Sequence, residues 1–244
     1  YVATMIHEQN SIVGVSNKMV AKYMDAIVIC YEKCFEEFGR EKTRLLGNPR
    51  ASNAVHAVFD RDYFLSLGLT LNKPLILVVM GSLGSTSVNA IMKDALPAVR
   101  DTYQILFVTG KNNYEKMRKQ IHAPHVKVVD YVKQLDIMAQ VDLIVCRAGA
   151  TTAAEITALG TPSILVPSPY VAHNHQFYNA SVLVDNKAAV MIEEKDLNAE
   201  VLSSQIDRIM SDDVLRASMH SAALALGKPH ASEDILNWCD EMKR

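Results

Sequence analysis

Two short segments rich in glycine, serine and threonine each follow an apolar run that has the character of a buried strand. The first is Met80-Gly81-Ser82-Leu83-Gly84-Ser85-Thr86, and the second runs from Cys146 to Glu155 as CRAGATTAAE. Glycine lets the backbone turn tightly and approach a ligand, and free N–H groups at a helix start favour an anion. The first segment is neither a Walker A loop nor a GxGxxG fingerprint. Taken singly, each also fits an ordinary capped turn between a strand and a helix.

Glu155, at the end of the second segment, has two interpretations. With Thr152 it matches a capping box at a helix start, where Thr151 could also serve as the cap. Near a nucleotide, its carboxylate would instead accept two hydrogen bonds from a ribose diol. Ligands of open α/β sheets bind at the carboxyl ends of the strands. Two glycine-bearing turns at that edge therefore favour a nucleotide-like ligand.

Two polar clusters supply further candidates. One cluster lies at the start of an expected helix and has the sequence His173-Asn174-His175-Gln176-Phe177-Tyr178-Asn179-Ala180. Its amide and imidazole groups could bind sugar hydroxyls or could simply cap the helix at the surface. Its HxH pair has no third ligand nearby, so the pattern does not indicate a metal site. Ile6-His7-Glu8-Gln9-Asn10-Ser11 leaves the first expected strand, and its polar side chains are expected to line the mouth of the first domain. His7 and Glu8 are candidate acid–base groups, although a histidine at a strand end is as often only a hydrogen-bonding partner.

Buried strands and helical patterns alternate along the chain and must position these segments. The expected strands are Val2–Ile6, Ala26–Cys30, Thr43–Leu46, Leu75–Met80, Tyr103–Val108, Val126–Val129, Leu143–Cys146 and Ser163–Val166. The expected helices are Ser11–Met24, Arg61–Leu67, Thr86–Arg100, Tyr114–Ile121, Gln134–Gln140, Thr152–Leu159, His175–Asp185, Val201–Met210, Val214–Leu226 and Ala231–Lys243. This rhythm predicts right-handed βαβ units and doubly wound parallel sheets.

The elements are distributed unequally, and this predicts three parts. Residues 1–48 form part of one α/β domain, residues 49–227 a complete second α/β domain, and residues 228–244 a closing helix. The chain begins at Tyr1 rather than Met, and a strand follows at once, which indicates that an N-terminal portion is absent.

The composition is that of an ordinary globular protein. The 244 residues carry 25 lysines and arginines against 27 aspartates and glutamates, a net charge of −2. This balance excludes a disordered chain and argues against a nucleic-acid partner, which needs a basic excess. The four cysteines are too few and too scattered for a disulfide framework. No apolar run approaches the roughly 20 residues that span a bilayer.

Several motifs occur in the order seen in one family. They are HEQNSIVG from His7, GNPR from Gly47, GSLG from Gly81, CRAGATTAAE from Cys146 and HQFYNA from His175. On these motifs the chain resembles the bacterial MurG family of UDP-N-acetylglucosamine:undecaprenyl-pyrophosphoryl-N-acetylmuramyl-pentapeptide N-acetylglucosaminyltransferases. The resemblance covers nearly the whole chain.

The resemblance implies a GT-B fold: two Rossmann-like domains, the first only partly present here, with a C-terminal helix that crosses back to the first domain. The family's N-terminal glycine-rich loop, with its histidine, has no counterpart in this sequence. The identity of the catalytic base is therefore open, and we expect the 244 residues alone to be inactive in transfer.

The resemblance also implies a donor site for UDP-GlcNAc. Ser82 and neighbouring amides would hold the diphosphate, with Arg147 either nearby or in a structural ion pair. Gln176 and Asn179 would contact the sugar hydroxyls, and Asn10 would be a further contact of UDP-GlcNAc. Glu155 would contact the ribose, and the backbone of Val132 would contact the uracil. Backbone N–H groups would also surround the donor, those of Ala150, Thr151, Thr152, Ala153 and Ala154. Arg50 departs in spacing from some family members, which leaves its uracil-side role open.

The implied reaction is an inverting transfer of GlcNAc to the C4 hydroxyl of the lipid-linked muramyl-pentapeptide, which completes the disaccharide for peptidoglycan and cell-wall synthesis. No metal or other cofactor is expected, because N–H dipoles can stabilise the departing UDP. We expect peripheral attachment to the cytoplasmic side of the cell membrane, with the Ser11–Met24 helix and its lysines either near the lipid or simply solvated. Two alternatives stay open: a UDP-GlcNAc 2-epimerase of the same fold, and a donor-binding module that needs a separate subunit.

Overall fold

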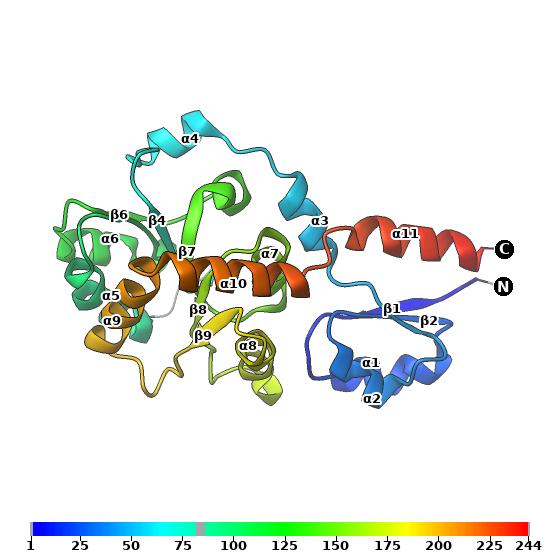
Figure 1. Ribbon diagram of the computed structural model, residues 1–244. Coiled ribbons are helices and arrows are strands. Elements are labelled where there is room, and N and C mark those ends of the chain that lie inside the picture. The colour runs from blue at the N-terminus through cyan, green and yellow to red at the C-terminus, as the bar shows by residue number, and fades with distance from the viewer. Residues whose placement is uncertain (1, 82–85, 244) are drawn as a thin grey trace.

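The computed structural model describes residues 2–81 and 86–243 and contains two parallel β-sheets, one small and one large, arranged along the length of the molecule (Figure 1). The small sheet has the order β1-β2-β3, formed by Met5–Glu8, Ala26–Ile29 and Thr43–Leu45. Its central strand β2 is fully buried because every residue is alanine, isoleucine or valine. One face is covered by the short segments after β1 and β2, and the other by the last helix.

The large sheet has the order β6-β5-β4-β7-β8-β9, with all neighbours parallel. Its strands, in chain order, are β4 (Leu75–Val79), β5 (Gln104–Val108), β6 (Val126–Val129), β7 (Val141–Cys146), β8 (Ser163–Leu165) and β9 (Ala189–Met191). Along β4, Ile76 and Val78 enter one core while Leu75 and Leu77 enter the other. Strands buried on both faces have this continuous apolar character. The strand order reverses between β4 and β7, which makes this pair the switch point of a doubly wound sheet.

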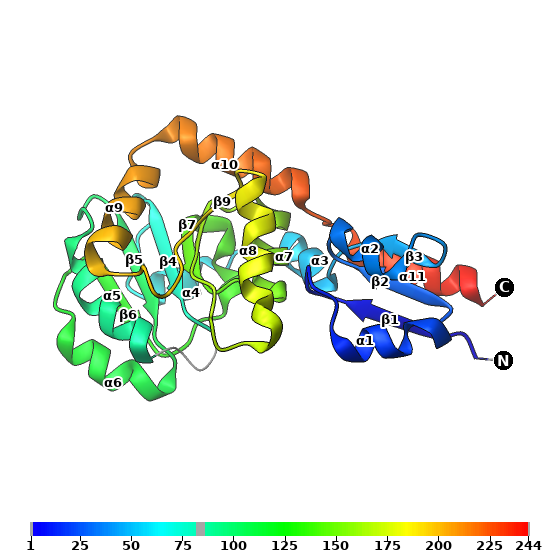
Figure 2. The same ribbon diagram turned by 90° about the horizontal axis from the view of Figure 1, so that it is seen from below.

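Helices cover both faces of the large sheet (Figure 2). Those on one face are α5 (Thr86–Ala98), α6 (Lys111–Gln120) and α9 (Ala199–Met210), and those on the other are α4 (Arg61–Ser66), α7 (Ala150–Leu159) and α8 (His175–Asp185). Helix α10 (Asp213–Leu226) contributes Met219 to one core and Ala223 to the other. The expected α/β architecture of parallel sheets is therefore confirmed.

The final helix α11 (Ala231–Met242) leaves the large sheet and packs on the small one, as Figure 2 shows. Its Trp238 lies against Ala26 and Val28 of β2, and the guanidinium of Arg44 lies 4.4 Å from the centre of the indole ring. This confirms the expected helix that crosses back to the first unit.

Several expected elements differ from the structure. The Ser11–Met24 helix is only α1 (Val15–Val20) with a 3-10 turn, Ala21–Tyr23, because no residue of α1 is buried and nothing packs its full length. Gln134–Gln140 forms two 3-10 turns, broken at Ile137. The short strand β9 was not expected.

Helix α3 (Pro49–His56), which joins the two sheets, was also not expected. Its start shows the signals of a helix rather than a turn. Asn48 is the N-cap and accepts a hydrogen bond from Arg50 N, while Pro49 occupies the first helical position, where its missing N–H costs nothing. Two further short elements, the 3-10 turn Glu32–Cys34 and α2 (Phe35–Phe38), complete the small unit.

Within residues 2–81 and 86–243, the helices are all too short or too polar to cross a bilayer. The same residues hold no cluster of three or more histidine, cysteine or acidic side chains that could bind a metal ion.

Candidate functional site

The strands that precede the two glycine-bearing segments are neighbours in the large sheet. Strands β4 and β7 pair in parallel up to Val79 and Cys146, and both turns begin directly after these residues. Gly81 has a φ of +88°, a conformation that favours glycine. Ser82, the expected diphosphate contact, lies outside the described residues. The switch point of the sheet therefore carries both of the turns that the sequence singled out.

The second turn leaves the start of α7 open. The helix begins at Ala150 with Gly149 as its N-cap, and no side chain caps it, so the expectation that Thr151 or Thr152 serves as the cap is wrong. A helix start has free N–H groups in its first turn, here those of Ala150, Thr151 and Thr152. The N–H of Ala153 instead donates to Gly149 O.

Ala153 and Ala154 therefore cannot offer the free N–H groups expected of them. Their N–H groups lie within the hydrogen-bonded part of the helix. Their side chains line a different feature, a cavity of about 380 Å³ between the two sheets, together with Cys30, Gly47 and Thr157.

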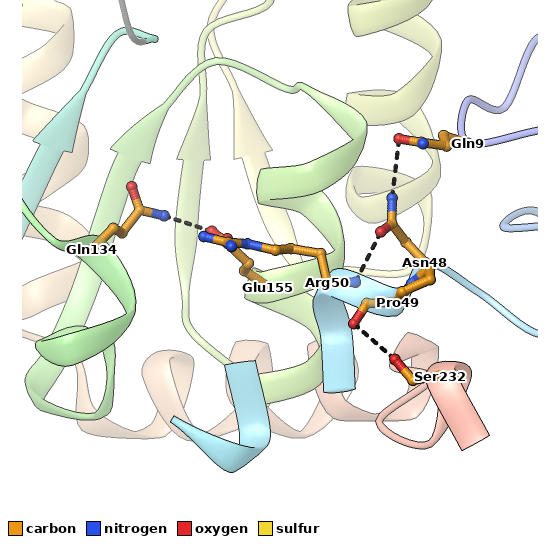
Figure 3. A network of polar contacts seen from close by, with 7 residues as sticks. All are labelled: Gln9, Asn48, Pro49, Arg50, Gln134, Glu155 and Ser232. Atoms are coloured by element: carbon orange, nitrogen blue, oxygen red, sulfur yellow. Dashed lines mark hydrogen bonds and ion pairs between the residues drawn. The ribbon is translucent and has the colours of Figure 1, made fainter. Parts of the chain in front are cut away.

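Glu155 is a buried member of a polar network that joins five parts of the chain, namely Gln9, Asn48–Arg50, Gln134, Glu155 and Ser232 (Figure 3). Its Oε1 accepts a short hydrogen bond from Arg50 Nε, and its Oε2 accepts one of 2.6 Å from Gln134 Nε2. The capping-box interpretation is therefore wrong, since both oxygens point to side chains of other elements. Burial raises the pKa of Glu155, and the contacts with Arg50 and Gln134 oppose that shift.

The same network fixes the segment between the sheets. Asn48 caps α3 through its oxygen, and its Nδ2 donates to Gln9 Oε1 at 3.2 Å. The hydroxyl of Ser232, at the start of α11, reaches Pro49 O at 3.4 Å. Gln134 belongs to the loop after β6, next to Val132, whose side chain is buried so that only its backbone could meet a ligand.

Arg147 follows β7 and takes part in an almost buried ion pair. Its guanidinium donates to Glu194 Oε2 at 2.7 Å and to Val166 O at 3.0 Å, and both side chains of the ion pair are almost buried. Of the two roles left open by the sequence, the structure supports the structural ion pair.

Asn179 and Asn10 meet between the two units. Asn179 Oδ1 accepts from the N–H and the hydroxyl of Ser11 at 2.9 and 3.0 Å, and its Nδ2 donates to Asn10 Oδ1 and Ala148 O at 3.1 and 3.2 Å. An amide offers two donors and one oxygen with two lone pairs, so this completely buried side chain is fully engaged. Its expected contact with a sugar is therefore replaced by a joint between α8 and the segment after β1.

Gln176, one turn earlier on α8, is differently placed. Its Oε1 accepts from Ser168 N at 2.8 Å, which holds the amide against the proline-flanked loop. Because that oxygen faces the backbone, the NH₂ group is the part of the amide presented to a ligand. Gln176 is half-buried, which suits a side chain at the wall of a site.

His7 and Glu8 make contacts inside the small unit. Nε2 of His7 lies 3.1 Å from Gly47 O and 3.3 Å from Cys30 Sγ, and burial lowers the pKa of His7. Glu8 is almost completely buried and accepts hydrogen bonds from Asn10 N, Gly14 N and the amide of Asn17. The expectation that these side chains line an open mouth is therefore wrong for Glu8, which organises its own loop.

The partners of Glu155 were not found in the sequence. Gln134 stands 21 residues before Glu155 in an irregular loop without a local signal. Arg50 stands 105 residues away, at the start of a helix that was not expected.

The sequence matches the family model described as "Glycosyltransferase family 28 C-terminal domain" over residues 75–235. A curated relative from Limosilactobacillus reuteri, named UDP-N-acetylglucosamine–N-acetylmuramyl-(pentapeptide) pyrophosphoryl-undecaprenol N-acetylglucosamine transferase, is 42% identical over 97% of this chain and 66% of its own length. The chain thus spans about two thirds of the length of this relative.

Solved structures with the same fold include MurG of Acinetobacter baumannii, with a TM-score of 0.80 and 24% identity over 98% of this chain and 68% of that one. A putative UDP-N-acetylglucosamine 2-epimerase from Listeria monocytogenes has a TM-score of 0.70 and 13% identity, covering 90% of this chain and 60% of that one. These structures confirm the expected GT-B type of fold.

Proposed function

Because the chain belongs to glycosyltransferase family 28, we propose that it is the donor-binding part of an inverting N-acetylglucosaminyltransferase. The protein moves GlcNAc from UDP-GlcNAc to the C4 hydroxyl of undecaprenyl-pyrophosphoryl-MurNAc-pentapeptide in peptidoglycan synthesis. The observation that carries this proposal is the pairing of β4 with β7, which brings two glycine-bearing turns to one sheet edge in a chain whose relatives are named as this transferase.

The diphosphate binds at the start of α7. The N–H groups of Ala150, Thr151 and Thr152 point out of an uncapped helix end, where the helix dipole favours an anion. Ser82, whose role is carried over from the family resemblance, is the second proposed contact of the diphosphate. Negative charge grows on the UDP as the bond to the sugar breaks, and dipoles fixed in advance stabilise such charge most effectively.

The other parts of the donor follow from the surrounding side chains. Glu155 accepts the ribose hydroxyls, and the backbone of Val132 meets the uracil edge. The NH₂ group of Gln176 donates to a GlcNAc hydroxyl, and Asn10, held by Asn179, lies at the same side of the site. Asn179 itself supports this wall and has no direct sugar contact.

Isothermal titration calorimetry of the 244-residue chain with UDP-GlcNAc and UDP-glucose tests the proposal. We expect the chain to bind UDP-GlcNAc more tightly, and Gln176→Ala and Ser82→Ala each to weaken binding by about 1–2 kcal/mol. Equal affinity for the two nucleotide sugars would remove the sugar-reading role of Gln176. No binding of UDP at all would refute the donor site.

Transfer itself requires a base that deprotonates the acceptor hydroxyl. Both local candidates have protein partners, since Glu8 accepts three hydrogen bonds from its own loop and His7 contacts Gly47 O. We therefore expect the 244 residues to bind the donor without transferring the sugar. Turnover of the lipid acceptor by this chain alone would show that the base lies within it, and His7→Gln would then identify or exclude the histidine.

A 2-epimerase is the second candidate, because a putative enzyme of that class shares the fold. Epimerisation needs no acceptor and changes only the C2 centre of the sugar. Incubation of the chain with UDP-GlcNAc alone, followed by proton NMR of the anomeric region, separates the two functions. We expect unchanged UDP-GlcNAc, and growth of the C2 epimer would favour the epimerase.

The acceptor is lipid-linked, so we propose peripheral attachment to the cytoplasmic face of the cell membrane. On the segment after β1, Val15, Met19 and Tyr23 are exposed together beside Lys22. Apolar side chains next to lysines are typical of helices that lie in a membrane interface. Co-sedimentation with anionic phospholipid vesicles tests this surface, and Met19→Glu is expected to reduce the bound fraction.

A further inference from the structure

Glu155 is held from two sides by side chains that come from separate segments. Arg50, in the first turn of α3, donates to one carboxylate oxygen, and Gln134, in the loop after β6, donates to the other (Figure 3). The Glu155 side chain is only 3% exposed, whereas that of Arg50 is 39% exposed. The carboxylate is therefore fixed in the interior while part of the guanidinium reaches solvent.

The two protein donors use only half of the hydrogen-bonding capacity of the Glu155 carboxylate. An ionised carboxylate has about four lone-pair sites, and the two protein donors occupy one on each oxygen. One site therefore remains on each oxygen, which matches the two donors of a ribose diol. A carboxylate that could rotate would lose this match, so the orientation set by Arg50 and Gln134 decides how well the diol fits.

The donors also keep the carboxylate ionised. Burial raises the pKa of Glu155, and Arg50, as a hydrogen-bond donor and a positive charge, is the largest opposing influence, followed by Gln134. On β7, the Cys146 thiol also faces Glu155, but burial raises the pKa of that thiol far above neutrality, so it carries no charge. Loss of the guanidinium would therefore leave a buried carboxyl that protonates more readily and can no longer accept two hydrogen bonds.

The positions of Arg50 and Gln134 indicate that their contacts with Glu155 are more than local packing. Gln134 lies two residues after Val132, the proposed uracil contact, and Arg50 is held by the Asn48 cap in the segment between the sheets. A buried ion pair is by itself weak evidence for a stabilising role, because its desolvation cost offsets much of the attraction. A role in orienting Glu155 accounts for both donors.

We propose that Arg50 and Gln134 are positioning residues of the ribose site, which act on the nucleotide through the Glu155 carboxylate and make the site selective for a 2′-hydroxyl. This inference rests on the proposed function, in which Glu155 accepts the ribose hydroxyls. It differs from direct uracil recognition by Arg50, in which the guanidinium would touch the base.

The test is calorimetric binding of UDP, 2′-deoxy-UDP and CDP to the full chain and to Arg50→Lys, Arg50→Met, Gln134→Leu and Gln134→Asn. We expect the unmodified chain to prefer UDP over 2′-deoxy-UDP by about tenfold, the usual worth of a hydrogen bond to a charged group. In the four variants this preference should fall to about threefold or less, while the preference for UDP over CDP is kept. Each preference is a ratio within one protein, so partial loss of folded material does not affect it.

Arg100→Lys and Gln120→Leu serve as matched controls, because both side chains are exposed on the far part of the large unit. A second readout is the pH dependence of UDP affinity. In Arg50→Met the loss of affinity on acidification should begin at a higher pH than in the unmodified chain, because Glu155 has lost its positive neighbour.

The outcomes separate the two levels of the argument. If the unmodified chain binds UDP and 2′-deoxy-UDP equally, Glu155 does not contact the 2′-hydroxyl, and its ribose role fails together with this inference, whereas the donor site itself fails only if UDP does not bind at all. If the unmodified chain discriminates and the variants keep the tenfold ratio, only the positioning role is refuted. If Arg50→Met loses the preference for UDP over CDP instead, Arg50 reads the base directly.

Discussion

Replacement of Asn179 by aspartate tests the joint between the two units with almost no change in shape. The wild-type amide accepts two hydrogen bonds from Ser11 and donates two, to Asn10 Oδ1 and Ala148 O. An aspartate keeps the accepting oxygen but turns the donor into a second acceptor that faces two oxygens. Two hydrogen bonds are lost, and a charge is buried without a partner.

The cost follows from these losses. Each hydrogen bond contributes about 1 kcal/mol net, and a buried group left unpaired adds about 1–3 kcal/mol. We therefore expect Asn179→Asp to lower the free energy of unfolding by about 3–5 kcal/mol at neutral pH. Burial raises the pKa of the introduced carboxyl above its value in the unfolded chain, so the folded state binds the proton more tightly. The deficit should shrink to about 1–2 kcal/mol as the pH falls through that raised pKa.

The chain contains one tryptophan, and its position makes the assay specific. Trp238 is buried against the small sheet, so its fluorescence during urea unfolding reports on the unit that Asn179 joins to α8. Asn186→Asp is the control, since Asn186 lies at the exposed end of the same helix and its substitution should cost no more than about 0.5 kcal/mol. A difference below about 0.5 kcal/mol between the two variants, or a deficit that does not change with pH, would refute the joint.

Three further predictions concern single side chains. Gln176→Ala should weaken UDP-GlcNAc by about 1–2 kcal/mol and leave UDP unchanged in calorimetry, because only the sugar meets its NH₂ group; an equal loss for both ligands would contradict this. The affinity for UDP-GlcNAc should decline on acidification at a higher pH than an ordinary carboxyl would give, since burial raises the pKa of Glu155. In Glu155→Gln the affinity should be lower throughout and should not show this decline. Arg147→Met should lower the free energy of unfolding by about 2–4 kcal/mol, because Glu194 is left nearly buried without its positively charged partner. Urea unfolding followed by circular dichroism measures this change, and a change below about 0.5 kcal/mol would show that the ion pair does not stabilise the fold.

Local patterns in the sequence were sufficient for the sheet and its edge. A strand such as β4, with five consecutive apolar residues, has to be buried on both faces, and this places its glycine-bearing turn at the carboxyl edge. The same reasoning placed the turn after β7, and the two strands belong to one parallel sheet as expected. These features depend on residues close together in the chain, so their signals are local.

The orientation of individual polar side chains could not be read in this way. Thr152 and Glu155 have the spacing of a capping box, but Glu155 reaches partners 21 and 105 residues away. Asn179 lies in a segment suited to sugar binding, but Ser11, which is 168 residues distant, takes up its oxygen. The partner of each polar side chain is decided by packing between the units. A short motif shows which polar groups are present but does not show which of them contact a ligand.

The segment from Gly47 to Arg50 explains why these distant contacts are mutually dependent. Gly47 has a φ of +86°, and a Cβ there would lie 2.4 Å from Lys228 Cβ. Only glycine therefore lets the segment that leads from the small sheet to the large one pass close to the segment that returns at Lys228. The next residues cap α3 and bring Arg50 to Glu155, while Pro49 O meets the start of α11. The same four residues thus contribute both to the relative placement of the sheets and to the orientation of the Glu155 carboxylate. A change in one therefore has to be accommodated by the other, so the environment of Glu155 on the large sheet depends on residues that precede that sheet in the chain.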